Sequence, residues 1–267
     1  MAGAAAPFVR DVGAGPVVLC LHSNASSSGQ WRGLMDLLAP THRLLAPDLL
    51  GAGRSAPWPV AGGARLQHEL DALAPVLQQA GERFHLVGHS YGAALALRIA
   101  LDGPQRVASL ALFEPTLFPL LNRPGPGQPG ATGIAAVAPE AAAAVARGDL
   151  QAAGAGFIDY WMGPGSWAAM PEARRSVVAE SMRPVGQWGE AVFAEPWDLA
   201  ALARLPMPLL LLGGDRSPAS AQDLLPLLAT AMPRAQLRLL PGLGHMGPVT
   251  HAQVVNPLIA DFLAAQG

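Results

Sequence analysis

The five residues Gly88-His89-Ser90-Tyr91-Gly92 constrain the fold of this chain more than any other segment. An apolar run, Phe84 to Val87, precedes them, and a run typical of a helix, Ala93 to Leu101, follows. Gly-x-Ser-x-Gly between a strand and a helix is the pattern of a nucleophile elbow, a turn too tight for side chains on either side of the serine. We therefore expect Ser90 on a strained backbone, with an exposed hydroxyl and the N-terminal end of a helix beside it.

The composition favours a large globular core and excludes several kinds of catalytic site. The 267 residues are 51% hydrophobic and 13% charged, and the net charge of −2 gives no reason to expect nucleic acid or an anionic membrane as a partner. All 17 cations are arginine, so a Schiff-base lysine, a P-loop lysine and a Ser-x-x-Lys pair are excluded. The expected partner is a small-molecule substrate, and no cofactor is indicated.

The cysteine content and the N-terminal sequence favour a cytoplasmic protein. Cys20 is the single cysteine, which rules out an internal disulfide, and its apolar surroundings indicate a buried, unreactive thiol. Met1–Pro7 does not have the basic start and apolar core of a signal peptide. No uncharged apolar stretch reaches the roughly 18–20 residues of a membrane span. None of these features determines the oligomeric state.

Short apolar runs alternate with helical patterns along most of the chain, which predicts the α/β class with a mostly parallel sheet flanked by helices. The expected strands are Val17–Leu21, Arg43–Pro47, Phe84–Val87, Val107–Phe113, Met207–Gly213 and Ala235–Leu240. The expected helices are Trp31–Leu38, Arg65–Ala80, Ala93–Leu101, Ala219–Ala231 and Val254–Ala265. Four consecutive leucines, Leu209 to Leu212, leave no polar side and indicate a strand buried on both faces.

The alternation stops between Glu114 and Asp198, where we expect a helical subdomain inserted as a cap over the active site. Asn122–Gly133 is rich in proline and glycine, and we interpret it as a linker that cannot hold a helix. Four of the six tryptophans fall in the insertion, which favours an apolar or aromatic substrate. The candidate substrate-pocket residues are Trp161, Trp167, Trp188 and Met246.

A serine hydroxyl becomes a nucleophile when a general base takes its proton, and His245 is the candidate base. It lies in the glycine-rich segment Pro241–Gly247 after the last expected strand, where a loop can carry the imidazole across the strand ends to Ser90. His251 is a weaker alternative, and the two histidines have neither the spacing nor the neighbouring acids of a metal site. His89 is directed away from Ser90 by the turn, so we interpret it as structural.

The base needs a carboxylate to orient it, and the sequence offers two at the ends of expected strands. Asp215 follows the leucine strand in the segment Gly213–Ser217, at a carboxyl end where active sites of open parallel sheets form. Glu114 is the rival, because it ends the strand just before the insertion. Asp215 is the first choice.

An oxyanion hole needs two N–H donors directed at one point. The backbone N–H of Tyr91, directly after the nucleophile, is one expected donor. We expect the second from the loop His22–Ser28 after the first expected strand, with Asn24 as first choice and Ser23 as second. The same serine-rich loop also suits a cap for the helix that begins near Trp31.

Four motifs give the chain a resemblance to the α/β-hydrolase superfamily, in particular to its cap-bearing serine esterases and C–C hydrolases. They are LHSNASSSGQW at Leu21–Trp31, APDLLGAGRS at Ala46–Ser55, LVGHSYGAA at Leu86–Ala94, and the pair LLLLGGDRSP at Leu209–Pro218 and GLGHMGP at Gly242–Pro248. The resemblance implies an α/β-hydrolase fold with an eight-strand-type sheet and a helical cap after the sixth strand. It divides the chain into a core of residues 1–116 and 199–267 and a cap of residues 117–198. The family's triad order, Ser–Asp–His, favours Asp215 over Glu114.

Three departures from the family pattern matter. The oxyanion loop has His22-Ser23 where relatives usually have His-Gly. Only Met1–Gly15 precedes the first parallel strand, so the usual N-terminal antiparallel hairpin must be short or partly missing. Relatives that open epoxides or cleave carbon–halogen bonds have an aspartate nucleophile, so Ser90 disfavours both reactions.

We therefore expect hydrolysis of a small apolar or aromatic carboxylic ester through a covalent acyl-enzyme. Hydrolysis of a carbon–carbon bond in a diketone or dienoic acid is the alternative, and a non-catalytic ligand receptor is less favoured. The carbon–carbon reaction needs a pocket cation for the substrate carboxylate. Arg174, Arg175 and Arg183 of the insertion are available, but such arginines more often form a solvated face.

Overall fold

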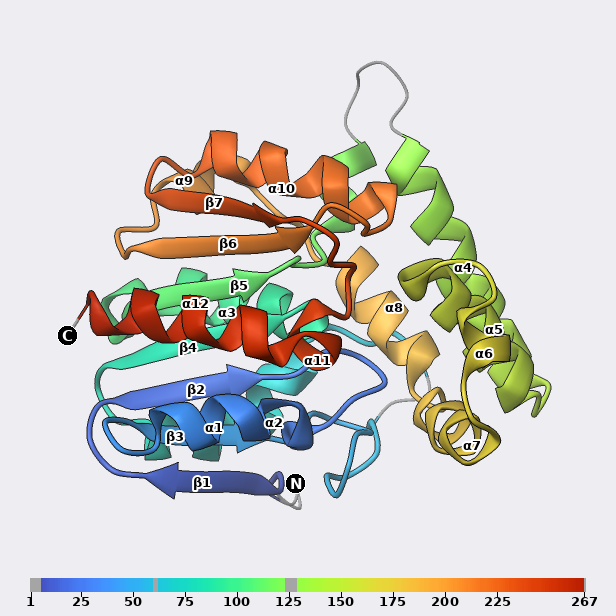
Figure 1. The fold of residues 1–267 in the computed structure, drawn as a ribbon, viewed down its shortest axis with the longest axis horizontal. Coiled ribbons are helices and arrows are strands. Elements are labelled where there is room, and N and C mark those ends of the chain that lie inside the picture. Colours follow the sequence, from blue (N-terminus) through green and yellow to red (C-terminus); the bar gives the residue numbers. More distant parts are fainter. Residues whose placement is uncertain (1–5, 60–61, 123–128, 267) are drawn as a thin grey trace.

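The strands form one sheet with a parallel centre, and helices cover both of its faces (Figure 1). A computed structural model of the protein describes residues 6–59, 62–122 and 129–266, and in these residues the sheet has seven strands in the order β1-β3-β2-β4-β5-β6-β7. The strands are β1 Val9–Gly13, β2 Val17–Leu21, β3 Arg43–Pro47, β4 Phe84–His89, β5 Val107–Phe113, β6 Leu209–Gly214 and β7 Ala235–Leu240. β1 pairs antiparallel with β3, and the other neighbouring pairs are parallel.

Helices pack on the sheet in two layers, with a further group at its carboxyl-end edge (Figure 1). The helices are α1 Arg32–Leu38, α2 Leu66–Gln79, α3 Tyr91–Asp102, α4 Pro129–Ala146, α5 Leu150–Met162, α6 Ser166–Ala169, α7 Glu172–Ser181, α8 Val185–Phe193, α9 Leu199–Ala203, α10 Ala219–Ala231, α11 Gly247–Thr250 and α12 Ala252–Ala264. α1 and α12 share one apolar cluster with the sheet, whereas α2, α3 and α10 belong to a second one. Within the described ranges, no helix is both long and apolar enough to cross a lipid bilayer.

The α/β class with a mostly parallel sheet is confirmed, and the six expected strands are all present. The implied eight-strand-type sheet is wrong for the described residues, where β1 alone precedes the parallel strands. β1 carries Arg10 and Asp11 at a sheet edge and is partly exposed along its length. A strand with so little buried surface gives a weak apolar pattern, which is why the sequence did not predict it.

Helices α4 to α8, which we call the insertion, lie between β5 and β6 in the chain and at the carboxyl ends of the parallel strands (Figure 1). The expectation that Asn122–Gly133 holds no helix is wrong at its end, because α4 begins at Pro129. Proline is well placed there, since the first residue of a helix has no internal acceptor for its N–H. The residues 123–128 of the expected linker lie outside the described part of the chain.

The strand–turn–helix at Ser90 has the geometry of the expected elbow. Ser90 adopts φ 57° and ψ −116°, a positive-φ conformation that is costly for a residue with a side chain. A Cβ built on Gly92 would lie 2.2 Å from the carbonyl oxygen of Leu21, and one built on Gly88 would lie 2.6 Å from the Cα of Ala93. Both contacts involve backbone atoms, so α3 can pass this close to β4 only with glycine at position 88, and this close to β2 only with glycine at position 92.

Gly92→Ala should lower the free energy of unfolding by about 1–3 kcal/mol, the usual cost of forcing a methyl group into a packed interior. Gly156→Ala in α5 is the matched control, because a Cβ there meets no atom within 4 Å and a helical glycine gains stability as alanine. Urea unfolding of both variants measures the difference. Equal stability of the two would contradict the close approach of α3 to β2.

Candidate active site

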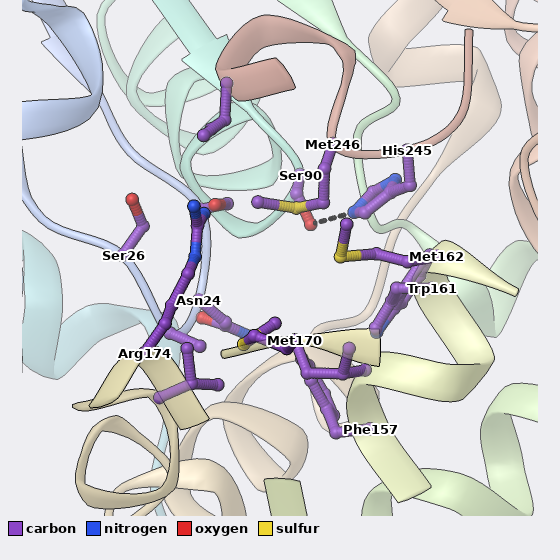
Figure 2. Close-up of a pocket in the computed structure, with 15 residues that line it drawn as sticks. Asn24, Ser26, Ser90, Phe157, Trp161, Met162, Met170, Arg174, His245 and Met246 are labelled. Atoms are coloured by element: carbon purple, nitrogen blue, oxygen red, sulfur yellow. Dashed lines mark hydrogen bonds between the residues drawn. The ribbon is translucent and has the colours of Figure 1, made fainter. Parts of the chain in front are cut away.

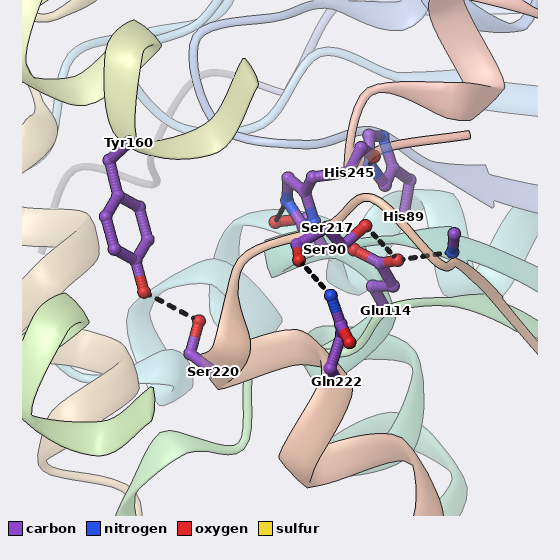
Figure 3. Close-up of polar contacts among 9 residues, drawn as sticks. His89, Ser90, Glu114, Tyr160, Ser217, Ser220, Gln222 and His245 are labelled. Carbon is purple, nitrogen blue, oxygen red and sulfur yellow. Dashed lines mark hydrogen bonds and ion pairs between the residues drawn. The ribbon is translucent and has the colours of Figure 1, made fainter. Parts of the chain in front are cut away.

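Ser90, His245 and Glu114 form a buried chain of hydrogen bonds at the carboxyl ends of the central strands (Figures 2 and 3). The Nε2 atom of His245 lies 2.9 Å from Ser90 Oγ, and its Nδ1 atom lies 2.6 Å from Glu114 Oε2. The exposed fractions of the three residues are 4%, 3% and 2%. This is the geometry in which an imidazole can take the proton of a serine hydroxyl while a carboxylate holds the opposite ring nitrogen.

The three residues come from three separate connections of the sheet. Ser90 follows β4, Glu114 follows β5, and His245 lies in the loop between β7 and α11. His89 fixes this loop, because its Nε2–H donates to the carbonyl oxygen of His245 over 2.8 Å. Burial lowers the pKa of His89 well below its usual value, so the ring is neutral and has one N–H to give. His89 thus has the structural position that the sequence predicted.

The prediction that Asp215 contacts His245 is wrong, because Glu114 makes that contact. Asp215 lies on the exposed side of the turn after β6, where its Oδ1 atom accepts the backbone N–H of Gly242 over 2.7 Å. It therefore braces the start of the loop that carries His245. Asp215 and Glu114 follow neighbouring strands, so a position at a strand end could not distinguish between them.

Hydrogen bonds hold both carboxylate oxygens of Glu114. Oε2 contacts His245, while Oε1 accepts the backbone N–H of Gly214 over 2.7 Å and the hydroxyl of Ser217 over 2.6 Å (Figure 3). The residue adopts φ 46°, a second positive-φ conformation at the site. A carboxylate fixed in this way keeps one oxygen directed at the imidazole.

The expected oxyanion donors Asn24 and Tyr91 both lie beside the nucleophile. Tyr91 is the first residue of α3, so helix geometry leaves its N–H without an internal acceptor. Asn24 lines the pocket above Ser90 (Figure 2). Ser23, the second choice, is unsuitable as a donor because its N–H already reaches Gln30 Oε1 over 3.3 Å.

A buried neutral histidine holds the loop that carries Asn24. The Nδ1–H of His22 donates to the carbonyl oxygen of Ser23 over 2.7 Å, and its Nε2 accepts the N–H of Leu49 over 3.0 Å. Burial lowers the pKa of His22 to about 4, so this pair of bonds persists at neutral pH. The structural role of His22 was not predicted from the sequence.

A second buried group supports the elbow from the other side. Glu69 in α2 accepts the hydroxyl of Tyr91 over 3.2 Å and the N–H of Leu50 over 3.1 Å. Burial raises the pKa of Glu69 to about 8, so the carboxyl is mostly protonated at neutral pH. No sequence pattern singled it out, because its position in a long helix resembles that of an ordinary surface acid.

The pocket above Ser90 has a volume of about 130 Å³ and lies between the core and the insertion (Figure 2). The ring of Trp161 stacks on His245 with a centroid distance of 3.9 Å. Met246 also lines this pocket, and Trp188 lines a smaller cavity that Ser90 lines as well. Trp167 does not belong to either wall, because it packs against Gly154 within the insertion.

Further lining residues come from the insertion and from α11. Arg174 was among the arginines that the sequence offered as a pocket cation, whereas the others were not predicted: Phe157, Ile158, Met162, Met170, Val178 and Val249. All but Arg174 are apolar, and apolar residues on helices are indistinguishable by pattern from ordinary core residues. Arg174 is the cation of this pocket among the described residues, and Figure 2 shows its side chain extending from α7 into the hollow.

His251, the weaker alternative to His245 as the base, pairs with its neighbour Thr250, with 2.9 Å between Nδ1 and Oγ1. In the described part of the chain, no group of three or more histidine, cysteine or acidic side chains could hold a metal ion. Cys20 is fully buried and burial raises its pKa, which removes it from nucleophilic chemistry.

Comparison with known proteins places these residues in a family context. The family described as alpha/beta hydrolase fold matches residues 16–252 of the chain. The haloalkane dehalogenase of Bradyrhizobium diazoefficiens is 37% identical over 39% of this chain and 34% of its own length. The 2-hydroxymuconate semialdehyde hydrolase of Pseudomonas sp. strain CF600 is 27% identical over 96% of this chain and 89% of its own.

Solved structures of other proteins share the fold of this chain over nearly its whole length. A thermophilic esterase from Thermogutta terrifontis, with malate bound, has a TM-score of 0.70 at 24% identity, covering 97% of this chain and 93% of that one. For the first curated relatives, by contrast, the match spans only 29% to 35% of their own length. The activities of those whole proteins are therefore no guide by themselves to this chain.

The geometry predicts that Glu114, and not Asp215, controls the reactivity of Ser90. Glu114→Gln should slow covalent labelling of Ser90 by a fluorophosphonate by about 10³–10⁴, because the amide favours the wrong imidazole tautomer. Asp215→Asn keeps an oxygen for the Gly242 N–H and should change the labelling rate by a few-fold at most. A larger loss of labelling rate in Asp215→Asn than in Glu114→Gln would show that Asp215, and not Glu114, orients His245.

Proposed function

Because the chain belongs to the α/β-hydrolase fold family, we propose that it is a serine hydrolase that cleaves an apolar or aromatic carboxylic ester of modest size. The observation that carries the proposal is the contact of Ser90 Oγ with His245, whose other nitrogen meets Glu114. The apolar walls of the pocket around Ser90 favour an uncharged acyl group. The expected partner is accordingly a small molecule.

Acylation begins when Ser90 Oγ attacks the ester carbonyl and its proton passes to Nε2 of His245. The imidazolium that forms is stabilised by the Glu114 carboxylate at Nδ1. Negative charge develops on the former carbonyl oxygen, which lies against the N–H groups of Tyr91 and Asn24. His245 then gives its proton to the departing alcohol oxygen, which leaves an acyl group on Ser90.

Deacylation repeats the sequence with water in place of the alcohol. His245 takes a proton from water, whose oxygen attacks the acyl carbonyl, and the proton then returns to Ser90 Oγ as the acid departs. The face of Trp161 against His245 favours the imidazolium at both stages, since an aromatic face attracts a cation.

Serine also disfavours the reaction of the relatives named haloalkane dehalogenase. A carboxylate that displaces a halide forms an alkyl ester, and water can cleave that ester at its carbonyl. A serine hydroxyl would form an ether, which has no carbonyl for water to attack. Ser90 therefore suits acyl substrates, from which it forms a hydrolysable ester.

Ser90→Ala should lower kcat for p-nitrophenyl butanoate by about 10⁴–10⁶, as in other triads whose members act as a unit. Steady-state hydrolysis of this ester measures the loss, and Ser26→Ala, which changes a pocket hydroxyl outside the triad, is the control. Ester hydrolysis by Ser90→Ala at the wild-type rate would remove the proposed role of Ser90.

The second candidate is hydrolysis of a carbon–carbon bond in a diketone or dienoic acid by the same three residues. The pocket position of Arg174 favours it, because the guanidinium could bind the carboxylate of such a substrate. Arg183, by contrast, pairs with Glu180 over 2.7 and 3.0 Å. The relative named 2-hydroxymuconate semialdehyde hydrolase, similar over most of both chains, supports the same candidate.

Arg174→Ala separates the two candidates. If a carboxylate is bound there, KM for a dienoic acid substrate should rise by about 10- to 100-fold, because a charge-assisted pair is lost. Hydrolysis of neutral p-nitrophenyl butanoate should then change little. Arg175→Ala on the same helix is the control, and equal effects of the two variants would argue against a carboxylate site.

A further inference from the structure

Three methionines line the pocket above Ser90, and they differ from the other methionines of the chain. Met162 ends α5, Met170 follows α6, and Met246 directly follows His245, so three separate segments bring their thioethers to one hollow (Figure 2). Each of the three is at least partly exposed. The other methionines of the described residues are at most 5% exposed and belong to the core: Met35, Met182, Met207 and Met232. The three pocket methionines are therefore not packed as core side chains, and the pocket is the hollow that they share.

The volume of this pocket, which we call the catalytic pocket, corresponds to one six-membered ring. It measures about 130 Å³. An apolar cavity of about 150 Å³ in another protein binds one benzene molecule. The wall beside the methionines is also apolar, since Ile158, Val178 and Val249 belong to it. The catalytic pocket thus has the size and the lining for a single apolar ring.

Thioether side chains favour an aromatic ring over a saturated one. The polarizable sulfur of methionine makes favourable contacts with aromatic rings at about 5 Å, often at the ring edge. An aliphatic wall would gain free energy only from the apolar area that it buries, and that area is at least as large for a saturated ring. Phe157 and Trp161 add aromatic groups to the same lining, and aromatic pairs also attract each other beyond their buried area.

The position of His245 assigns the ring to the alcohol part of an ester. His245 must protonate the departing alcohol oxygen, so the alcohol lies in the hollow that His245 lines. Among the described residues, His245 lines the catalytic pocket but not the smaller cavity at Trp188. The catalytic pocket is therefore the place of the leaving group.

We propose that the catalytic pocket binds a single aromatic ring in the alcohol part of the ester, and that Met162, Met170 and Met246 select this ring through their sulfur atoms. This inference rests on the proposed ester hydrolysis, which identifies the part of the substrate that lies beside His245. The substrate class is then a benzyl or phenyl ester, and hydrolysis releases an aromatic alcohol or a phenol together with the acid. The three methionines determine specificity and take no part in the proton transfers.

Benzyl butanoate and cyclohexylmethyl butanoate test the preference for an aromatic ring, because both are esters of primary alcohols that carry a six-membered ring. Wild-type kcat/KM should favour the benzyl ester by at least about fivefold, since three sulfur–aromatic contacts are available. Titration of the released butanoate at constant pH measures both rates. Hydrolysis of each ester by hydroxide alone corrects for intrinsic reactivity. A corrected ratio of one or below would overturn the proposal.

Replacement of the three methionines by leucine removes the sulfur atoms at nearly constant volume. The triple variant Met162→Leu, Met170→Leu and Met246→Leu should bring the ratio of benzyl to cyclohexylmethyl hydrolysis down to about one. The ratio cancels a general loss of activity, because the same triad acts on both esters. Met182→Leu is the matched control, since Met182 is fully buried in the same insertion and should keep the wild-type ratio. A wild-type ratio in the triple variant would show that the sulfur atoms do not select the ring.

A two-ring ester tests the size of the site. The ester 2-naphthylmethyl butanoate exposes more apolar surface than benzyl butanoate, so a site that responded to area alone would favour it. In a pocket for one ring, its kcat/KM should be lower by at least about fivefold, because the second ring must displace packed side chains. An equal or higher kcat/KM for the naphthylmethyl ester would rule out a single-ring site.

Binding separates failure of the ring site from failure of the proposed function. Calorimetry with Ser90→Ala protein should show benzyl butanoate binding at least about fivefold more tightly than cyclohexylmethyl butanoate. The three leucine substitutions should abolish this difference. If the wild type hydrolyses no ester but the binding preference depends on the methionines, the ring site stands and the proposed reaction falls. If Ser90 hydrolyses both esters without preference, the reaction stands and the ring site is refuted.

Discussion

The architecture of the active site depends on one buried contact, between the Glu114 carboxylate and Nδ1 of His245. A carboxylate removed from water is costly by several kcal/mol unless hydrogen bonds replace its hydration. Glu114 receives three such partners, from His245, Gly214 and Ser217. The end of β6 and the turn after it thus donate hydrogen bonds to the residue that follows β5. These bonds join two neighbouring strand ends into one rigid unit.

The insertion is coupled to this unit through α5. Trp161 stacks on His245 at 3.9 Å, so the helix that carries the indole also limits the movement of the imidazole. One residue earlier, the hydroxyl of Tyr160 donates to Ser220 Oγ of α10 over 2.8 Å. Ser220 is fully buried in the core, and this bond therefore anchors α5 to the part of the fold that holds β6. A displacement of the insertion would disturb the base itself as well as the shape of the pocket.

The sequence predicted the features that local patterns determine, but it did not predict the contact that depends on how distant segments approach one another. The strands and the Ser90 elbow follow from apolar runs and from glycine spacing, both readable within about ten residues. The choice between Asp215 and Glu114 depends on how the loop after β7 approaches β5 and β6. Gly242, early in that loop, donates to Asp215, and the loop then carries His245 back to Glu114. No pattern within either strand contains that information.

Backbone strain is concentrated at the same edge of the sheet. Among the described residues, the residues other than glycine with a positive φ are Ala25, Ser90 and Glu114. Each follows one of the three adjacent strands β2, β4 and β5, and each such residue costs about 1–3 kcal/mol. Close packing around the elbow offsets this free-energy cost, because Gly88 and Gly92 let the elbow pack against backbone on both sides. The strain is what turns the chain sharply enough to leave Ser90 Oγ and Glu114 Oε2 facing the same imidazole.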